Sequence, residues 1–487
     1  MDALAFEHHL TSPQGHRHIP GGDFTVTADG GSCCDQITFS LATDGERITD
    51  AGFDADGCGA ATAAGSAAVT LVRGMGLLGA ARIGSAAIAE ELGGLSPAKI
   101  HAAELAADAL ARALGAAARG GARLAPPADG VRTLVAMSGG VDSSVVALLC
   151  GRDGDTVAVT LELWADAEND AERSCCSSSA VAQARALAHS MGLPHFTIDL
   201  RDEFRAGVVE PFIAGYAAGE TPNPCVGCNG HVRLDAMLEL AERLGAVQLA
   251  TGHYARIADT HDAAGPLLRV AVDVAKDQTY MLAALDPASL ARMCFPLGDL
   301  TKPEVRRIAA GAGLPVASKV DSQDLCFLAG TSRGRFLERH GALGVRRGQI
   351  VDRDGGVLGM HDGQHLFTVG QRRGIGLASG EPLYVLEKNA EHNRVVVGPR
   401  TALAARRVAL RGVRLHRDGG RVNRVKLRYR SKPLPAEVDD EVGAGRHREV
   451  TVTLRDGVEG PAPGQLACLL DDDRVVGWGT IVGSLRR

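Results

Sequence analysis

The stretch VAMSGGVDSSVVALLC, residues 135–150, decides the fold class of the sequence around it. Its apolar start predicts a strand that ends at Met137, followed by a Ser/Gly turn and a helix that begins near Val141. Gly139 and Gly140 leave backbone N–H groups open to an anion, and the helix N-terminus adds its positive dipole. An ordinary glycine turn with a serine cap is the alternative, but the coincidence of features favours a phosphate-binding loop.

Three side chains in the first helical turn add to this interpretation. Ser143 and Ser144 supply hydroxyl donors, and Asp142 is placed to orient a magnesium ion or a loop amide. The lysine of the G-x-x-x-x-G-K-[ST] pattern is missing, so the loop is not that of the P-loop NTPases.

Short β-rich runs alternate with amphipathic helical stretches from residue 131 to about 330. This alternation is typical of βαβ units and predicts an α/β domain with a parallel sheet. The runs are TLVAM (133–137), TVAVTLELW (156–164) and AVQLATGHY (246–254). The helical stretches are VAQARALAHSMG (181–192) and RLDAMLELAERLG (233–245).

The flanking sequence differs on the two sides. Residues 111–130 are rich in Ala, Gly and Pro without apolar periodicity and predict a linker, which would let the part before it move. After about residue 400, short alternating runs punctuated by Gly and Pro predict a small antiparallel barrel or sandwich. Residues 401–487 carry 17 basic and 11 acidic side chains, although the whole chain has a net charge of −6. Random drift explains this equally well, but the sharper interpretation is a tail domain that meets a polyanion.

Composition limits the class of protein. The chain has 487 residues, of which 45% are hydrophobic and 23% charged, which suggests about three globular domains. No stretch approaches the ~18 unbroken apolar residues of a membrane span. The start MDALAFEHHL (1–10) has neither the basic nor the apolar region of a secretion signal. Eleven cysteines in such a chain favour metal binding or catalysis in a reducing cytosol, so we expect a cytoplasmic protein without a membrane partner.

Two cysteines lie in distinctive surroundings. Cys228, in TPNPCVGCNGHVRLD (221–235), is expected just before a helical run, where a helix N-terminus lowers the thiol pKa. Cys326 lies in SKVDSQDLCFLAG (318–330). Either one could instead be a buried, inert thiol, and the sequence does not show that they meet.

The loop SGGVDSS (138–144) resembles the PP-loop of ATP pyrophosphatases, which transfer AMP to a substrate oxygen. With six further stretches in order, the chain from about 131 to 487 resembles the bacterial tRNA-specific 2-thiouridylases (the MnmA/TrmU family). The resemblance implies a Rossmann-like PP-loop domain (adenine nucleotide alpha hydrolase-like) over 131–333, a small central tRNA-contacting domain over 334–400 and a C-terminal β-barrel over 401–487. The further stretches are TPNPC..CN (221–229), ATGHYAR (250–256), AKDQTYML (275–282), DSQDLCF (321–327), FTVGQRRGIGL (367–377) and VKLRYRS (425–431).

This resemblance implies an ATP-dependent tRNA-uridine 2-sulfurtransferase. The wobble uridine C2 oxygen would be adenylated with release of pyrophosphate, and a persulfide sulfur would then displace AMP to give 2-thiouridine. Cys326 matches the persulfide carrier, and Cys228 matches the nucleophile that releases the sulfur through a transient disulfide. The implied cofactors are ATP and Mg²⁺. The residues that match the family's ATP site are Met137, Ser138, Gly139, Gly140, Val141, Asp142, Ser143, Ser144, Leu161 and Gly252.

The implied partners are tRNA, with the Lys, Glu and Gln acceptors expected, and a cysteine desulfurase or another persulfide donor. The segment 371–373 is expected near the RNA as well. The residues that match tRNA-contacting positions are Asn223, Pro224, Cys225, His253, Lys276, Asp277, Gln278, Arg428, Tyr429 and Gln465.

One position departs from the family pattern. Many relatives have aspartate where this chain has Cys225, so the site contains Cys225, Cys228 and Cys326. Three thiolates suit an iron–sulfur cluster with one open iron, so cluster-dependent thiolation is the alternative to the persulfide route. Cys175 and Cys176 are expected to line a mobile loop rather than to bind metal.

The front of the chain, residues 1–115 ahead of a linker at 116–130, resembles the NifU/IscU iron–sulfur scaffold family and implies an α+β domain. The matching segment is SCCDQITFSLATDGERITDAGFDADGCGAATAAGS (32–66), followed by a histidine where the family has His-Cys. Ala102 takes the place of the third family cysteine, unless Cys34 substitutes for it. The remaining candidate ligands are Cys33, Asp35, Cys58 and His101.

The four remaining ligands suit tetrahedral zinc, a labile cluster or persulfide on a cysteine. A degenerate scaffold that only docks a cysteine desulfurase is the alternative. At the level of the whole chain, fusion would raise the local concentration of sulfur donor. An iron–sulfur carrier with a secondary PP-loop part is the runner-up. A PP-loop amidotransferase-type ligase is disfavoured, because no glutaminase nucleophile motif appears.

Overall fold

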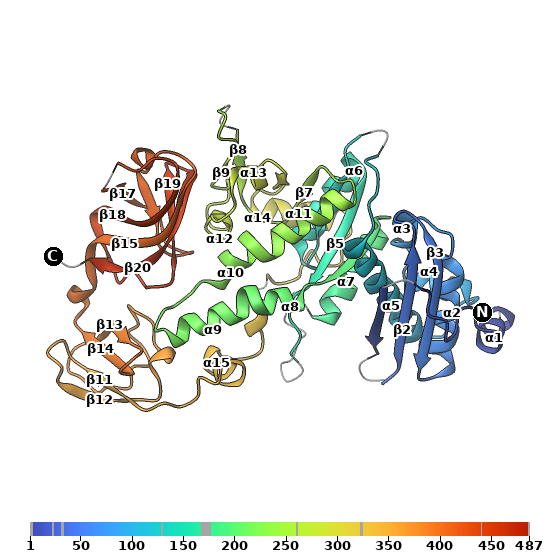
Figure 1. Cartoon of the computed structure of the whole chain (residues 1–487), viewed down its shortest axis with the longest axis horizontal. Helices are drawn as coiled ribbons and strands as arrows, with labels where there is room; N and C mark the ends of the chain where they lie inside the picture. Colours follow the sequence, from blue (N-terminus) through green and yellow to red (C-terminus); the bar gives the residue numbers. More distant parts are fainter. Residues whose placement is uncertain are drawn as a thin grey trace.

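The protein is described by a computed structural model. Figure 1 shows a front α+β domain, an α/β domain, a small central sheet and a barrel at the C-terminal end. Cys33, Cys175 and Cys176, for which the sequence makes predictions, lie outside the described residues. No helix among the described residues is both long and apolar enough to cross a membrane. The structure describes residues 3–21, 24–30, 34–127, 130–166, 177–259, 262–321, 325–439 and 441–485.

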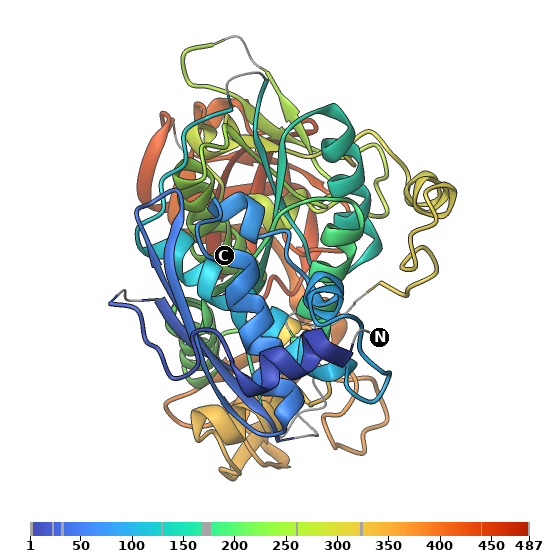
Figure 2. The same ribbon diagram turned by 90° about the vertical axis from the view of Figure 1, so that its right-hand side faces the viewer.

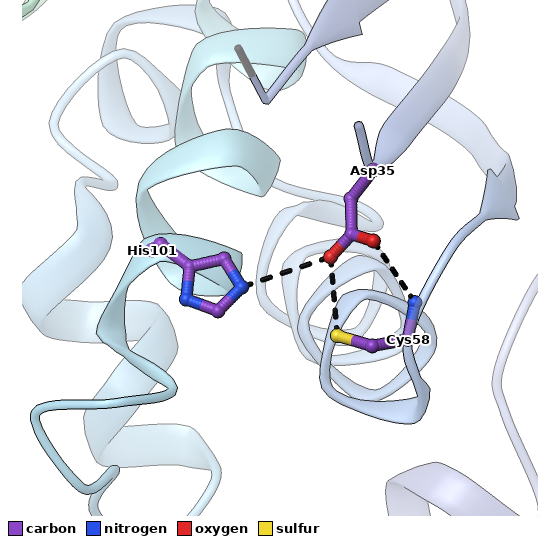
Figure 3. A group of neighbouring side chains, drawn as sticks. All are labelled: Asp35, Cys58 and His101. Carbon is purple, nitrogen blue, oxygen red and sulfur yellow. Dashed lines mark hydrogen bonds and ion pairs between the residues drawn. The ribbon is translucent and has the colours of Figure 1, made fainter. Parts of the chain in front are cut away.

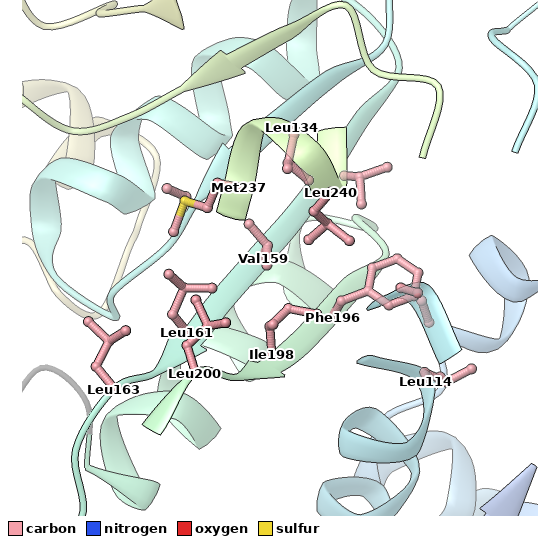
Figure 4. Packing of buried hydrophobic residues seen from close by; sticks show 14 of the residues in the cluster. Leu114, Leu134, Val159, Leu161, Leu163, Phe196, Ile198, Leu200, Met237 and Leu240 are labelled. Carbon is pink, nitrogen blue, oxygen red and sulfur yellow. The ribbon is translucent and has the colours of Figure 1, made fainter. Parts of the chain in front are cut away.

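The α/β domain is built on a five-stranded parallel sheet in the order β10-β7-β4-β5-β6. Every residue of β5 (Thr156–Glu162) is buried, as expected of a parallel strand covered on both faces. Figure 4 shows side chains of β5 and β6 packed beside Met237 and Leu240 of α11. The other strands are β4 (Thr133–Ala136), β6 (His195–Asp199), β7 (Gln248–Ala250) and β10 (Met293–Cys294). The main helices are α6 (Val141–Asp153), α7 (Ser178–Ser190), α11 (Leu234–Arg243) and α14 (Lys302–Gly311).

The chain order of this sheet positions the site. Strands β5 and β6 extend to one side of β4, whereas β7 and β10 extend to the other. Ligands bind at such a switch point, beyond the carboxyl ends of the strands. The predicted runs at 133–137, 156–164 and 246–254 contain β4, β5 and β7, and the predicted helical stretches 181–192 and 233–245 overlap α7 and α11, which confirms the α/β class.

The front domain is α+β, as expected. Its antiparallel sheet has the order β1-β2-β3, and helices α2 and α5 pack on it. Its strands are β1 (Phe24–Asp29), β2 (Gln36–Thr43) and β3 (Ile48–Asp56). Its helices are α1 (Ala3–Thr11), α2 (Gly59–Val72), α3 (Leu77–Ala80), α4 (Ser85–Glu91) and α5 (Ile100–Gly120).

The predicted linker is wrong over its first half. Helix α5 continues to Gly120, so residues 111–120 are helical, and Ala113, Leu114 and Ala117 are fully or almost fully buried. Alanine is the strongest helix former, and its small side chain lets a helix approach a neighbouring strand closely. Here α5 packs against β6 of the α/β domain, and the two domains share one hydrophobic cluster, part of which is drawn in Figure 4. Figure 2 looks onto the front domain, in blue, with the rest of the chain behind it.

Two β-structures follow the α/β domain. The central sheet has the order β12-β11-β14-β13 around its own small core. In the last domain six strands close into a barrel, because β15 pairs with both β18 and β20. The central strands are β11 (Gly348–Val351), β12 (Val357–His361), β13 (Tyr384–Asn389) and β14 (Arg394–Gly398). The barrel strands are β15 (Ala404–Leu415), β16 (Arg424–Lys426), β17 (Leu434–Val438), β18 (Gly445–Glu459), β19 (Leu466–Asp471) and β20 (Arg474–Leu485).

Shorter elements connect these bodies. A hairpin from the α/β domain extends the barrel sheet, because β9 pairs with β20. These elements are α8 (Arg201–Phe204), η3 (Arg205–Val209), α9 (Glu210–Ala217), α10 (Pro224–Gly227), η4 (Cys228–Arg233), β8 (Arg256–Ala258), β9 (Leu267–Arg269), α12 (Thr279–Leu282), α13 (Pro287–Leu290), η5 (Cys326–Leu328) and α15 (Arg333–Gly341).

Candidate functional site

The phosphate loop joins the end of β4 to the start of α6, which begins at Val141 as predicted and has Gly140 as its N-cap. Gly139 has a φ of +66°, and a Cβ there would lie 2.9 Å from the Ala180 carbonyl oxygen, so the position requires glycine. The Ser143 hydroxyl accepts a hydrogen bond from the Ser138 N–H at 3.1 Å, which fixes the turn. The loop thus lies at a helix N-terminus, where backbone N–H groups bind phosphate.

The carboxylate of Asp142 is held by two residues that the sequence analysis did not single out. Lys302 Nζ lies 2.8 Å from each of its oxygens, and the Tyr254 hydroxyl donates to it at 2.9 Å. Burial and the neighbouring Asp142 charge raise the pKa of Tyr254, which therefore stays a donor. A possible signal was present, because Lys302 opens α14, and a cation is unfavourable at a helix N-terminus unless it has a partner elsewhere.

Residues from the phosphate loop, the segment after β7 and the barrel line one cavity of about 1270 Å³. The predicted ATP-site residues in its lining are Ser138, Gly140, Val141, Asp142, Ser143 and Gly252. The predicted tRNA-site residues in its lining are His253, Lys276, Asp277, Gln278 and Tyr429. Two groups predicted from separate stretches of sequence therefore meet around one space.

The other predicted residues lie outside this lining. Met137, Ser144 and Leu161 are buried. Arg428 is exposed and donates to the Gly460 carbonyl oxygen at 2.6 Å. Those that do not line the cavity are Met137, Gly139, Ser144, Leu161, Asn223, Pro224, Cys225, Cys228, Cys326, Arg428 and Gln465.

Asp277 joins the barrel to the α/β domain. Its side chain is buried and accepts hydrogen bonds from the Thr279 hydroxyl at 2.8 and 3.0 Å and from Lys426 Nζ of β16 at 3.3 Å. Nearby, the Tyr280 hydroxyl donates to the Leu466 carbonyl oxygen at 2.7 Å. These contacts fix the barrel wall of the cavity against the nucleotide side.

Cys228 lies inside a helix rather than just ahead of one, which corrects the sequence expectation. The helical stretch begins at Pro224, because the Asn223 side chain caps it by accepting from the Cys225 N–H at 3.1 Å. It continues without interruption through η4 into α11. Gln465 Nε2 donates to the Thr221 carbonyl oxygen at 2.5 Å and so ties the barrel to the start of this segment.

The candidate cysteines border the interior. Cys228 is 8% exposed and belongs to the main hydrophobic cluster, while Cys326, at the start of η5, packs against the same cluster. Cys225 is partly exposed. Among the described residues, the sulfur atoms of these three cysteines are not brought within 4.8 Å of one another as a group.

Asp35, Cys58 and His101 of the front domain do form such a group (Figure 3), with one ligand atom of each within 4.8 Å of the others. Asp35 accepts from the Cys58 thiol and from the Cys58 N–H, both at 3.1 Å, and lies 3.7 Å from His101 Nε2. The Cys58 hydrogen bonds hold the pKa of Asp35 below its ordinary value, so the carboxylate is charged.

The backbone supports this front cluster. Gly57 has a φ of +151°, and a Cβ there would lie 2.3 Å from Asp35 Oδ1, so glycine lets the chain close on the carboxylate. Ala102, which replaces the third family cysteine, is fully buried. The O, S and N donors present suit a tetrahedral metal such as zinc.

The fold and the site define a PP-loop nucleotide-binding protein in which a β-barrel forms one wall of the cavity beside the phosphate loop, and in which a scaffold-like domain lies at the front of the chain. Comparison with protein families agrees. The matching family models are the NifU-like N terminal domain (7–119), the tRNA methyl transferase HUP domain (131–330), the tRNA methyl transferase PRC-barrel domain (334–399) and the Aminomethyltransferase beta-barrel domain (413–481). The chain belongs to the tRNA-specific 2-thiouridylase family, in its form fused to a NifU-like domain.

Relatives are similar along the whole chain or along its larger part. A bifunctional NifU/MnmA protein of Rubrobacter xylanophilus is 44% identical over 97% of this chain and 97% of its own length. A tRNA-specific 2-thiouridylase MnmA of Rhodospirillum rubrum is 43% identical over 74% of this chain and 98% of its own length. A tRNA-specific 2-thiouridylase MnmA of Heliobacterium modesticaldum is 42% identical over 72% of this chain and 92% of its own length.

Proposed function

We propose that this chain is an ATP-dependent tRNA-uridine 2-sulfurtransferase that converts the wobble uridine to 2-thiouridine. The observation that carries the proposal is the shared cavity, where the phosphate loop faces Lys276 and Tyr429 across one space. Relatives named as tRNA-specific 2-thiouridylases, each covered over more than nine-tenths of its length, support it.

In the first step, the uridine C2 oxygen attacks the α-phosphate of ATP, an O–P bond forms, and pyrophosphate leaves. The loop N–H groups at the start of α6 hold the phosphates. Mg²⁺ fits the carboxylate of Asp142, a hard oxygen donor, and when bound it neutralises phosphate charge. Lys302 now pairs with this carboxylate, so the ion and the ammonium compete for it. The proposed ATP-site residues are Met137, Ser138, Gly139, Gly140, Val141, Asp142, Ser143, Ser144, Leu161 and Gly252.

In the second step, sulfur replaces the adenylated oxygen. Cys326 carries the persulfide, and the Cys228 thiolate attacks its inner sulfur to form a Cys228–Cys326 disulfide and release hydrosulfide. Hydrosulfide attacks uridine C2, and AMP leaves with the oxygen. A thiol reductant supplies the two electrons that restore both cysteines.

The RNA is held along the barrel side of the cavity. Lys276 provides positive charge in the lining, Arg428 adds charge outside it, and Tyr429 offers a ring on which a base can stack. Asn223, Pro224 and Cys225 lie at the start of the Cys228 helix, where the target base would arrive. The remaining proposed contacts are His253, Asp277, Gln278 and Gln465. The expected substrates are wobble-uridine tRNAs for Lys, Glu and Gln.

The front domain is proposed to receive sulfur from a cysteine desulfurase or another persulfide donor. Cys58, exposed beside Asp35 and His101, is the sulfur- or metal-handling thiol. Zinc fits this set, with Cys33 as the proposed fourth ligand.

A second candidate is cluster-dependent thiolation. Cys225 and Cys228 are three residues apart in one helical segment and so share a face, and with Cys326 they offer three thiolates. Anaerobic purification with assays of iron, zinc and acid-labile sulfide separates the two routes. Iron and sulfide lost in Cys225→Ala would establish the cluster, whereas metal unaffected by that change supports the persulfide route.

The proposed function is tested by incubating the protein with ATP, tRNA and a persulfide donor, then measuring AMP and 2-thiouridine. Cys228→Ser and Cys326→Ser should each abolish thiolation while ATP and tRNA binding stay nearly intact, because neither side chain lines the nucleotide cavity. Cys150→Ser, a free thiol in α6 that does not line this cavity, is the control. Residual turnover in either active-site variant would remove that cysteine from the mechanism, and no thiolation by the wild type would refute the function.

A further inference from the structure

Asp321 lines the cavity and lies five residues before Cys326 in the chain. Its carboxylate forms ion pairs with three cations. Lys276 Nζ lies 2.7 Å from its Oδ2, while Lys302 Nζ at 2.8 Å and Arg306 at 3.1 Å hold its Oδ1. Burial alone would raise the pKa of Asp321, but hydrogen bonds from Lys276 and Lys302 hold it below its ordinary value. The carboxylate is therefore charged and fully engaged.

One of these cations, Lys302, also contacts the phosphate loop. The same Lys302 ammonium lies 2.8 Å from Asp142 in the phosphate loop, so it bridges that loop and Asp321. Its side chain is only 9% exposed, and solvent screening of the bridge is weak. Two residues before Asp321, Lys319 Nζ donates to the Gly139 carbonyl oxygen at 3.0 Å. The stretch that precedes Cys326 is thus attached to the phosphate loop at two points.

A second cation belongs to the RNA side. Lys276 lines the cavity, and its side chain is 39% exposed. Its partner oxygen on Asp321 differs from the one that Lys302 uses. The lysine proposed for RNA therefore pairs with Oδ2, whereas the lysine that also contacts the phosphate loop pairs with Oδ1.

We infer that Asp321 is a positioning residue that couples ATP and tRNA binding to the placement of Cys326. The inference rests on the proposed function. Lysine contacts to phosphate are charge-assisted and strong, so ATP phosphates draw Lys302 away from Asp321, and RNA phosphates draw Lys276 away. RNA thereby releases Oδ2 of Asp321, and ATP leaves Oδ1 held by Arg306 alone. Cys326 takes its reactive position only when both are bound, which keeps sulfur from being released without an acceptor.

The test compares wild type with Asp321→Asn, Asp321→Glu and the control Asp299→Asn. Asp299 is 79% exposed and pairs only loosely with Arg256, at 3.7 Å. Two quantities are measured on the full chain: the rate of Cys326 alkylation with no substrate, ATP, tRNA or both, and the AMP formed per 2-thiouridine. In the wild type, we expect alkylation of Cys326 to change by about tenfold only when both substrates are present, as loss of charge-assisted contacts implies.

In Asp321→Asn, Cys326 alkylation should no longer depend on the substrates, and AMP formed per 2-thiouridine should rise by about tenfold while adenylation continues. Asp321→Glu should restore part of the coupling, and Asp299→Asn should match the wild type. If Asp321→Asn keeps wild-type coupling, or loses adenylation and thiolation equally, the inference is wrong. Wild type that makes neither AMP nor 2-thiouridine would instead refute the proposed function.

Discussion

At the residue scale, two of the proposed RNA contacts differ in charge. Burial, with help from the nearby Arg233 charge, lowers the pKa of His253 to about 3, so its imidazole is neutral at neutral pH. Its Nδ1 lies 2.8 Å from the Thr251 hydroxyl, which fixes the ring. Arg428 is exposed and always charged. Of these two residues, only Arg428 therefore adds to the electrostatic part of RNA binding.

This difference in charge predicts that the two substitutions affect the salt dependence of tRNA binding differently. Arg428→Ala should weaken tRNA binding and lower the slope of log Kd against log salt by about one ion, because one phosphate contact is lost. His253→Gln should leave the slope unchanged, because a neutral side chain releases no counterion. Filter binding at several salt concentrations measures both. An unchanged slope in Arg428→Ala would move the RNA contact elsewhere.

The same lowered pKa has a consequence for stability at acid pH. Since the folded state keeps His253 neutral and the unfolded state protonates near 6.5, stability falls as pH drops below that value. His253→Gln removes this contribution, so its loss of stability between neutral pH and about pH 5 should be smaller than that of wild type. Thermal unfolding at a series of pH values measures it. Equal acid sensitivity of the two proteins would show that His253 is protonated in the fold.

At the element scale, the phosphate loop depends on one left-handed glycine. Gly139 and Gly192 both have positive φ, +66° and +72°, but only Gly139 faces a close neighbour. A Cβ at Gly139 would lie 2.9 Å from the Ala180 carbonyl oxygen, whereas Gly192 has open space. A side chain would therefore strain the backbone at either glycine, but only at Gly139 would it also clash with a neighbouring atom.

Gly139→Ala should therefore raise the KM for ATP by about tenfold or more, because the loop must shift to relieve the contact with α7. Gly192→Ala carries a similar strain of about 1 kcal/mol without a clash and should leave the KM unchanged. Pyrophosphate release against ATP concentration measures the effect. Equal KM values in the two variants would show that the loop tolerates a side chain at Gly139.

At the scale of the whole molecule, the front domain is seated on the α/β domain. Arg112 of α5 joins Asp108 at 2.7 Å and also pairs with Glu162 at the end of β5, and Arg185 of α7 reaches the same Asp108 at 2.7 Å. A Cβ at Gly115 would lie 1.8 Å from the Thr197 carbonyl oxygen of β6. Helix and strand thus touch at a glycine, beside a nearly buried ion network.

Gly115→Ala should force α5 away from β6 and lower the free energy of unfolding by about 1–3 kcal/mol, as overpacking does. Gly311→Ala, at the end of α14 with open space around it, should be neutral or slightly stabilising. Calorimetry and limited proteolysis of the front domain measure the difference. If Gly115→Ala unfolds like wild type, the two domains are not in this contact in solution.

What the sequence by itself determined was local. The phosphate loop, the alternation of strands and helices and the alternating strands of the barrel all follow from patterns within a few tens of residues, since backbone conformation and burial obey short periods. The ligand types of Asp35, Cys58 and His101 could also be predicted, because the residues themselves carry the chemistry. Their convergence within 4.8 Å required the fold.

Only the tertiary structure decided the contacts between distant segments. Lys302 bridging Asp142 and Asp321 has no local signature beyond an unfavourable cation at a helix start. The alanine-rich end of α5 was predicted as a linker, because a run of alanine shows no apolar periodicity in the sequence. Its packing against β6 is visible only in the structure. Pairings of this kind depend on how separate elements pack together, a long-range property that periodicity along the chain does not encode.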